Sequence, residues 1–518
     1  MGKKNSRIKN SAYNFITSIG AQFVSIVMHF VSRSIFISTL GENYLGISGL
    51  FDNILSMLSL AELGVGTAIL YRLYEPLAQD NKPRVQAWMY FYKQAYRVIG
   101  LVITAIGLCL IPFLPFIING YEKLDALGIN AVFIYCLFLF KSVSSYLFFA
   151  YRSAIVKADQ KEYLLTVVGY AVTIVTTILQ IISLILWRDF IAYLVIAIVM
   201  VLVQNIAYAI ISQKHYPYIS EKPKEKVSKE EIKDTVKDCF ALMLYRINSI
   251  ILKSTDYIVL SVFLGLSVIG LYSNYYIFYT TIQSLLNKVF GSVVHSIGNL
   301  HTTKKVEHEY LIFKTTVFIS LVLGATAGVG IFVVADEFIG TWIGSKWIIP
   351  QPFALLMGIE LLTLSLCTAL AKFRNALGLF QQAKYRPIFS AVVNIVVSVV
   401  SVKFLGIVGV IMGTIISYWT TFLVFDPVIL HKHGFGGKYP VKNFYFSVVG
   451  NLLVVAVAGF GLKILCSHLL VGMGWLSVIV HAVICGATIP RVMLLVNWKR
   501  AEIQYLVSVF KNKFLRKR

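Results

Sequence analysis

Charged residues are scarce in this sequence. Asp, Glu, Lys and Arg make up 14% of its 518 residues, whereas soluble proteins carry about 25%. Apolar runs of about twenty residues recur from Ser11 to Val496, and each is long enough to cross the hydrocarbon core of a bilayer. Between these runs no stretch is large enough to form a soluble domain with its own core. The composition therefore predicts an integral membrane protein.

Acidic residues are scarcer still, with 24 Asp and Glu against 47 Lys and Arg, which gives a net charge of +23. The basic residues concentrate in alternate connections between the apolar runs, about 33 on one side against about 5 on the other. Arg374 and Arg386 are among the residues on the basic side. The positive-inside rule places the basic connections in the cytoplasm, beside an anionic leaflet. Because these connections lack interleaved aromatic residues, we expect no nucleic-acid partner.

The apolar runs predict an all-α fold with about fourteen transmembrane helices and both termini in the cytoplasm, which requires an even number of helices. A separate short amphipathic helix is expected in the connection over 214–237, where Ser228 and Glu231 have the spacing of a capping box. The expected spans are 11–38, 47–73, 88–117, 129–151, 163–186, 190–213, 238–263, 267–298, 309–335, 350–372, 387–402, 406–430, 441–462 and 469–497.

Sequence motifs of catalytic, metal-binding and nucleotide-binding sites are also missing. The six cysteines have no metal or redox spacing, and no GxxxxGKS loop is present to hold a nucleotide phosphate. The nine histidines are scattered rather than gathered with carboxylates. The sequence therefore predicts no catalytic site, no metal site, no cofactor and no ATP-driven step.

The chain contains an internal repeat. Leu40-Gly41 and Leu45-Gly46 recur as Leu264-Gly265 and Ile269-Gly270, and the segment from Tyr151 to Ala154 recurs as the segment from Phe373 to Ala376. Six helices separate the equivalents, so the two halves have the same orientation, as in transporters with parallel repeats. The predicted parts are a six-helix lobe (11–213), a basic linker (214–237), a second six-helix lobe (238–433), two extra helices (434–497) and a basic tail (498–518).

Polar residues follow one face of the first two expected helices of each half, which indicates a shared polar cavity. Charges inside a membrane are costly and usually face such a cavity. The cavity has a basic bias, which suits an anionic group such as a diphosphate. The candidate substrate-binding residues are Arg33, Arg246, Lys253 and Lys288.

Other charged positions have two interpretations. Lys253 and Asp256 are three residues apart, so they can form an ion pair that only holds the helix. His29 suits a packing role as well as a proton carrier. Asp256 and Glu62 are candidates for coupling transport to protons or sodium. Glu360 has no partner that the sequence identifies.

The segments from Phe36 to Asn81 (beginning FISTLGENYLGISGLF) and from Ser254 to Tyr276 (STDYIVLSVFLGLSVIGLYSNYY) resemble the Wzx-type polysaccharide flippases. These proteins share a superfamily with the multidrug and toxin extruders and the lipid II flippases. The resemblance implies alternating access around a cavity whose basic residues contact an undecaprenyl-diphosphate-linked oligosaccharide. It further implies a bacterial cell membrane and, as partners, the bilayer, a polysaccharide polymerase and assembly proteins.

The function expected is a lipid-linked oligosaccharide flippase for capsule, exopolysaccharide or O-antigen synthesis. A lipid II flippase is the nearest alternative. A drug antiporter for cationic substrates would need an acidic cavity, and a glycosyltransferase or polymerase would need a large outer loop or a cytoplasmic catalytic domain. The sequence does not identify the sugar, the coupling ion, the oligomeric state or the type of cell envelope.

Overall fold

The computed structural model describes residues 2–62, 65–122, 124, 128–298, 306–350, 352–379, 381–470 and 472–515. Every element assigned in these ranges is a helix or a helical turn. In hydrocarbon, backbone N–H and C=O groups have no water to bond, and a helix pairs them within its own segment. The predicted all-α class is confirmed.

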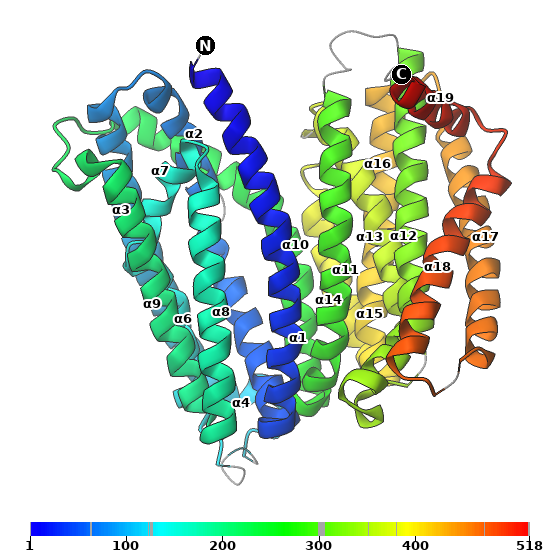
Figure 1. The fold of residues 1–518 in the computed structure, drawn as a ribbon, viewed down its shortest axis with the longest axis horizontal. Helices are drawn as coiled ribbons and strands as arrows, with labels where there is room; N and C mark the ends of the chain where they lie inside the picture. Colours follow the sequence, from blue (N-terminus) through cyan, green and yellow to red (C-terminus); the bar gives the residue numbers. More distant parts are fainter. Residues whose placement is uncertain are drawn as a thin grey trace. The chain divides into compact units, whose positions relative to one another are not determined.

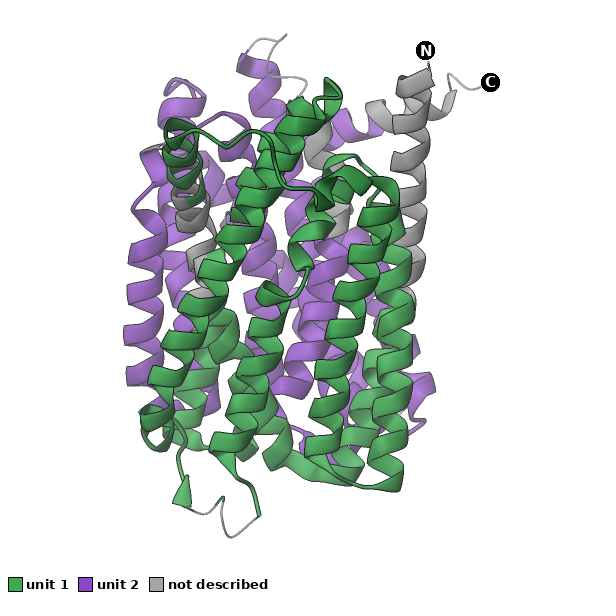
Figure 2. Cartoon of the chain, turned by 90° about the vertical axis from the view of Figure 1, so that its left-hand side faces the viewer, with its two compact units in different colours: residues 1–270 green, residues 271–518 purple. Residues whose placement is uncertain are grey.

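The chain forms two compact units, residues 1–270 and 271–518, shown in two colours in Figure 2. The helix α11 (Leu266–Gly298) begins in unit 1 and continues in unit 2. The helices of unit 1 are α1 (Gly2–Leu58), α2 (Val65–Ala78), α3 (Lys82–Leu110), α4 (Leu114–Ile117), α6 (Ala131–Leu147), α7 (Ser153–Ala158), α8 (Glu162–Leu186), α9 (Phe190–His215) and α10 (Lys229–Leu264) (Figure 1). The helices of unit 2 after α11 are α12 (Val306–Ile343), α13 (Phe353–Ala376), α14 (Arg386–Leu405), α15 (Ile407–Ser417), α16 (Leu423–Ile429), α17 (Val441–His468), α18 (Trp475–Val496) and α19 (Ala501–Leu515).

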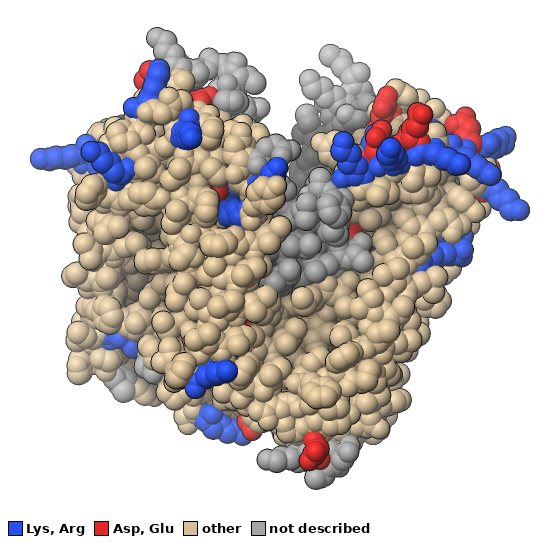
Figure 3. Space-filling view, turned by 180° about the vertical axis from the view of Figure 1, so that it is seen from behind, with Lys and Arg blue, Asp and Glu red and all other residues tan. Residues whose placement is uncertain are grey.

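Ten helices in the described ranges are long and apolar enough to cross a membrane, or eleven if the bent pair Ala131–Leu147 and Ala150–Ala158 is one span. On the face that Figure 3 shows, Lys and Arg lie mainly toward the top and bottom of the view, and most of the surface between is uncharged. The chain is therefore a multi-pass membrane protein, as its composition predicts. The number of fourteen spans and the side of the termini stay predictions.

Two expectations about single helices are wrong. The span expected over 47–73 is interrupted, because α1 ends at Leu58 and a 3₁₀ turn over Ser59–Glu62 precedes α2. The separate linker helix does not exist. The capping box of Ser228 and Glu231 is present, but it opens the 36-residue helix α10, which runs on into the apolar segment. No glycine or proline follows in this stretch to end the helix.

Glycines set the two repeated hairpins of unit 1. Gly41 (φ 82°) kinks α1 and Gly265 (φ 86°) separates α10 from α11, and both adopt backbone angles that favour glycine. A Cβ at Gly46 would overlap the carbonyl oxygen of Leu266, and a Cβ at Gly270 would lie 2.8 Å from that of Glu42. The two hairpins are therefore packed backbone to backbone.

Small residues also let α12 and α13 of unit 2 pack closely. Gly328 of α12 and Gly358 of α13 each leave no room for a Cβ beside the other's carbonyl group. About two turns away along the same helix pair, the Ser320 hydroxyl donates to the carbonyl oxygen of Ser365 at 2.7 Å. The Ser365 hydroxyl donates to the carbonyl oxygen of Ser320 at 3.0 Å. Close approach of this kind replaces the hydrophobic driving force that is missing between helices in lipid.

Candidate functional site

Arg33 lies inside the first span, about two turns before the kink at Gly41 and roughly 12 Å from it along α1. Its side chain is half-buried. The phenol groups of Tyr193 (α9) and Tyr257 (α10) interact with it electrostatically. Three helices thus meet at one guanidinium, which can bind a phosphate through several N–H groups at once.

An aromatic cluster fixes Tyr193 beside α1. The Phe36 ring lies 5.2 Å from the Tyr193 ring and 5.8 Å from the Phe190 ring, both edge to face. Tyr44 contacts Phe190 at 4.9 Å between ring centroids. Edge-to-face pairs contribute about 0.5–1.5 kcal/mol each beyond the area that they bury. The position of the phenol next to Arg33 is therefore held by packing.

Asp52 and Lys141 extend this polar region. Their carboxylate and ammonium groups are 3.4 Å apart, and the side chains are 56% and 32% exposed. Asp52 lies in α1 beyond the kink and Lys141 in the middle of α6. Asp52 also interacts electrostatically with Tyr193 and Tyr257. Charges so exposed within apolar helices indicate a hydrated space rather than lipid.

Glu62 is held by neutral donors. Tyr96 of α3 donates to its carboxylate at 2.5 Å and Tyr146 of α6 donates at 2.8 Å. Tyr92 donates in turn to the Tyr96 hydroxyl at 2.8 Å. In this tyrosine cluster both carboxylate oxygens of Glu62 thus accept hydrogen bonds from neutral phenol groups.

The structure places four of the predicted site residues. His29 is exposed and interacts electrostatically with Arg33, whereas Asp256 is buried in α10. Arg33 and Glu62 have the surroundings given above. The side chains of Arg246, Lys253 and Lys288 lie outside the described residues. The basic cavity and the Lys253–Asp256 pair therefore stay predictions.

Sequence reasoning missed the tyrosines. Tyr193 and Tyr257 belong to helices far from Arg33 in the chain, so no local pattern connects them to it. Tyr92 and Tyr96 are four residues apart on one face of α3, which was a usable signal for a polar face. Asp52 and Lys141 are 89 residues apart, and their pairing has no local signal.

Two carboxylates of unit 2 also accept hydrogen bonds from tyrosines, as Glu62 does. Glu360, which had no partner identifiable from the sequence, accepts from Tyr279 at 3.0 Å. Asp336 accepts from Tyr275 at 2.7 Å. Neutral tyrosine hydroxyls thus satisfy the hydrogen-bonding needs of these carboxylates without a second buried charge.

Asp426 of unit 2 is held by arginines instead. It is fully buried between two arginines, with Arg374 at 2.7 Å and Arg386 in direct contact on its other oxygen. Arg386 also lies over the Phe422 ring, 3.8 Å from its centre. π-Helical turns at Tyr418–Phe422 and Leu430–Gly434 flank the α16 segment that carries Asp426. Both arginines therefore belong to a buried ion cluster rather than to a solvated loop.

A further polar contact joins α12 and α18. Glu337 of α12 contacts His481 of α18 at 2.7 Å, and the other ring nitrogen of His481 lies 2.9 Å from the Leu469 carbonyl oxygen. Within the described part of the chain, no three His, Cys, Asp or Glu side chains gather as a metal site requires.

Comparisons with known proteins identify the family. The family model described as polysaccharide biosynthesis protein matches residues 11–295, more than half of the chain. A probable low-salt glycan biosynthesis flippase, Agl15 of Haloferax volcanii, is 24% identical over 215 residues. This match covers 40% of the chain and 44% of the relative, so the chain spans less than half of the curated relative that it matches.

Solved structures show the same fold. The lipid II flippase MurJ in an inward closed conformation superposes with a TM-score of 0.68 at 14% identity, over 97% of this chain and 100% of MurJ. An inward-facing multidrug transporter of the MATE family and MOP superfamily gives a TM-score of 0.56 at 13% identity, over 82% of this chain and 99% of that protein. The family match shows that the chain belongs to the polysaccharide biosynthesis protein family, and its fold is shared with these two membrane transporters.

Proposed function

We propose that the chain is a flippase that moves undecaprenyl-diphosphate-linked oligosaccharide repeat units from the cytoplasmic to the outer leaflet of a bacterial cell membrane. The product would serve capsule, exopolysaccharide or O-antigen synthesis, together with a polymerase and assembly proteins. The observation that carries the proposal is the half-buried Arg33 among phenol groups inside a span of a protein of this family. The glycan flippase among its relatives supports the substrate class.

The proposed binding step follows from the charges near Arg33. The Arg33 guanidinium binds the diphosphate, and Arg246, Lys253 and Lys288 extend the basic surface. The exposed Asp52–Lys141 pair offers hydrogen-bonding groups to the sugar, while the polyprenyl tail stays in lipid because its apolar surface gains nothing by leaving. No covalent chemistry and no cofactor are needed, so the chain acts as a transporter and not as an enzyme.

The proposed transport step is alternating access. Two parallel six-helix lobes (11–213 and 238–433), within fourteen helices with cytoplasmic termini, would rock around the site. Asp256, Glu62 or His29 would couple this motion to protons or sodium. Of these we take Glu62 as the coupling group, because it lies in the turn between α1 and α2 and its carboxylate accepts from Tyr96 and Tyr146.

Deleting the gene in its native host tests the proposal. We expect surface polysaccharide to be lost and repeat units to accumulate on the lipid carrier in the cytoplasmic leaflet. Plasmid-borne protein should restore both, and an Arg33→Gln variant at equal abundance should not. Failure of peptidoglycan synthesis instead would favour a lipid II flippase. Normal polysaccharide with altered sensitivity to cationic drugs would favour a cation-coupled multidrug antiporter.

A further inference from the structure

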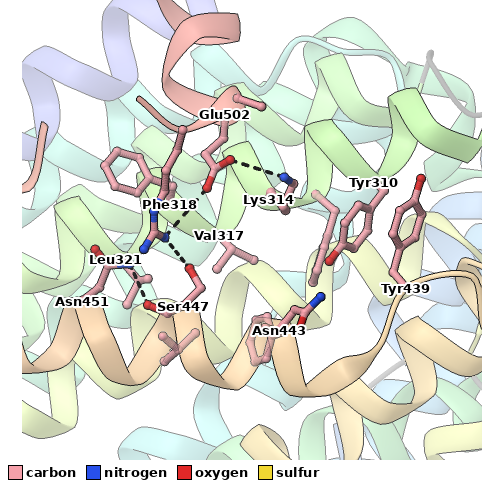
Figure 4. Close-up of a pocket in the computed structure, with 15 residues that line it drawn as sticks. Tyr310, Lys314, Val317, Phe318, Leu321, Tyr439, Asn443, Ser447, Asn451 and Glu502 are labelled. Atoms are coloured by element: carbon pink, nitrogen blue, oxygen red, sulfur yellow. Dashed lines mark hydrogen bonds and ion pairs between the residues drawn. The ribbon is translucent and has the colours of Figure 1, made fainter. Parts of the chain in front are cut away.

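A polar cavity of about 360 Å³ lies in unit 2 at the end where α12 and α17 begin. Figure 4 shows Lys314 of α12 and Glu502 of α19 on one side of it, and Asn443 and Ser447 of α17 on the opposite wall. The Lys314 ammonium is 3.4 Å from the Glu502 carboxylate. Arg500, which also lines the cavity, donates to the Ser447 hydroxyl at 2.6 Å.

The cavity presents positive charge. Two cations, Lys314 and Arg500, face one carboxylate, Glu502. Their side chains are 36% and 39% exposed, whereas that of Glu502 is only 8% exposed. An entering anion therefore meets the two cations while the carboxylate stays covered behind them. The net charge of +1 matches a single phosphodiester, which carries one negative charge.

A second cavity, an apolar groove, lies further along the same two helices, α12 and α17. On α17, Asn451 lines the polar cavity and the next residue, Leu452, lines the groove, which has a volume of about 280 Å³. The groove has few polar groups and runs between α12, α13 and α17. Gly459 lines it without a side chain, and a Cβ there would lie 3.2 Å from Val329. Its lining includes Val329, Phe332, Leu355, Ile359, Leu362, Val455, Ala456 and Phe460.

We propose that the polar cavity and the groove together bind an anionic phospholipid of the cytoplasmic leaflet. The phosphodiester lies between Lys314, Arg500 and the amide of Asn443, and one acyl chain lies in the groove. The positive-inside pattern puts this end of unit 2 at the cytoplasmic surface, where anionic lipids are enriched. The helix α19 lies at the same end (Figure 1) and contributes Glu502 to the cavity.

This site differs from the proposed substrate site. The substrate site is built on Arg33 in unit 1, whereas all lining residues here belong to unit 2. A volume of about 360 Å³ is at the lower end of the range for small-ligand pockets, roughly 300–1,000 Å³. It suits one headgroup rather than a diphosphate with an oligosaccharide. The proposal therefore does not depend on the transported molecule.

The test uses the full chain, purified and delipidated in neutral detergent. Phosphatidylglycerol, phosphatidylcholine, inorganic phosphate or undecaprenyl phosphate is added, and bound lipid is measured by native mass spectrometry. We expect phosphatidylglycerol to bind about tenfold more tightly than phosphatidylcholine. The double variant Lys314→Gln/Arg500→Gln should weaken phosphatidylglycerol binding by about tenfold or more. Lys499→Gln, which removes an exposed charge next to Arg500 without lining the cavity, should not.

A second pair of variants tests the groove and leaves Lys314, Arg500 and Glu502 unchanged. Ala456→Phe fills the groove and should abolish the phosphatidylglycerol preference, whereas Leu453→Phe on the exposed side of α17 should retain it. If the double variant fails to fold, this pair decides. Equal binding of phosphatidylcholine would overturn the proposal, as would binding unchanged by Ala456→Phe or a preference for inorganic phosphate or undecaprenyl phosphate.

Discussion

Ser267 donates a hydrogen bond of 3.2 Å to the side-chain oxygen of Asn43, and the two residues are 224 positions apart. This is the offset at which Gly41 recurs as Gly265, so each residue contacts its own equivalent in the repeat. Two copies can touch at equivalent points only on the axis that relates them. The reciprocal overlaps of Gly46 with Leu266 and of Gly270 with Glu42 agree with this symmetry. The hairpins over 41–46 and 265–270 therefore meet on a local pseudo-two-fold axis.

Replacing Gly46 with alanine should destabilise unit 1. The added Cβ overlaps the backbone carbonyl of Leu266, which a rotamer change cannot relieve. We expect a loss of about 1–3 kcal/mol, seen as a lower melting temperature of the purified protein. Gly450→Ala is the matched control, because a Cβ there meets nothing within 4 Å and α17 gains helix propensity. Equal melting temperatures for the two variants would contradict the close packing of the hairpins.

Replacing Asp426 with asparagine should cost about 3–5 kcal/mol, because two buried arginines lose their only carboxylate among the described contacts. The control is Glu307→Gln, which breaks an exposed pair with Lys438 at 3.6 Å and should cost less than about 1 kcal/mol. Changing both arginines to methionine as well should recover part of the loss. Thermal unfolding of the three variants measures these effects, and an Asp426→Asn protein as stable as Glu307→Gln would refute the buried cluster.

The sequence predicted the class of fold and part of the site. The polar faces of the expected helices indicated Arg33 and Glu62 as site candidates, and the repeat identified the glycines that turn the hairpins. It did not predict partners that arrive from other helices, such as Tyr146 for Glu62, because packing between helices leaves no local pattern. Arg374 looked like a loop charge, since its partner Asp426 is 52 residues away.

Two predicted helix boundaries were also wrong, for a physical reason. The capping box at Ser228 marks where a helix begins, but a polar stretch such as 229–237 can be a helix in water and then enter the membrane as part of the same helix. The residues change from polar to apolar at this point, but the backbone stays helical. The 3₁₀ turn before α2 was missed because Ser59–Glu62 reads as a continuation of the polar face.

Glu62→Gln should remove any response of transport to an imposed proton or sodium gradient, because Glu62 is the only carboxylate in the tyrosine cluster. The variant should remain folded, with a stability loss of about 1–3 kcal/mol from imperfect pairing of Tyr96 and Tyr146. Tyr146→Phe keeps the carboxylate and serves as the control, so its transport should still follow the gradient. Vesicle assays with and without a gradient measure this. Unchanged gradient dependence in Glu62→Gln would exclude Glu62 as the coupling group.

The start of α10 should lose stability in acid. The backbone N–H of Ser228, followed by its hydroxyl and by Arg84, lowers the pKa of Glu231. A carboxyl whose pKa is lower in the folded state stabilises the fold above its unfolded pKa, about 4.3, and this contribution is lost as the pH falls through the folded value.

At pH 7, Glu231→Gln should therefore be about 1 kcal/mol less stable than the parent, and the difference should shrink between about pH 5 and pH 3. Glu230→Gln, an exposed change in the same turn, is the control. Melting temperatures across this pH range provide the check. A difference that stays constant with pH would show that the charge of Glu231 is not involved.

As the proposed flippase, this chain should move a lipid-linked oligosaccharide across a bilayer with Arg33 on its diphosphate. The most direct measurement reconstitutes the purified protein into vesicles that contain the lipid-linked repeat unit extracted from the deletion strain. A membrane-impermeant glycosidase or lectin then reports the fraction of sugar on the outer surface. We expect the inner pool to become accessible in vesicles with the parent protein, and to stay protected with Arg33→Gln and in protein-free vesicles. Sugar that stays protected with the parent protein, or is exposed equally by Arg33→Gln, would contradict the account.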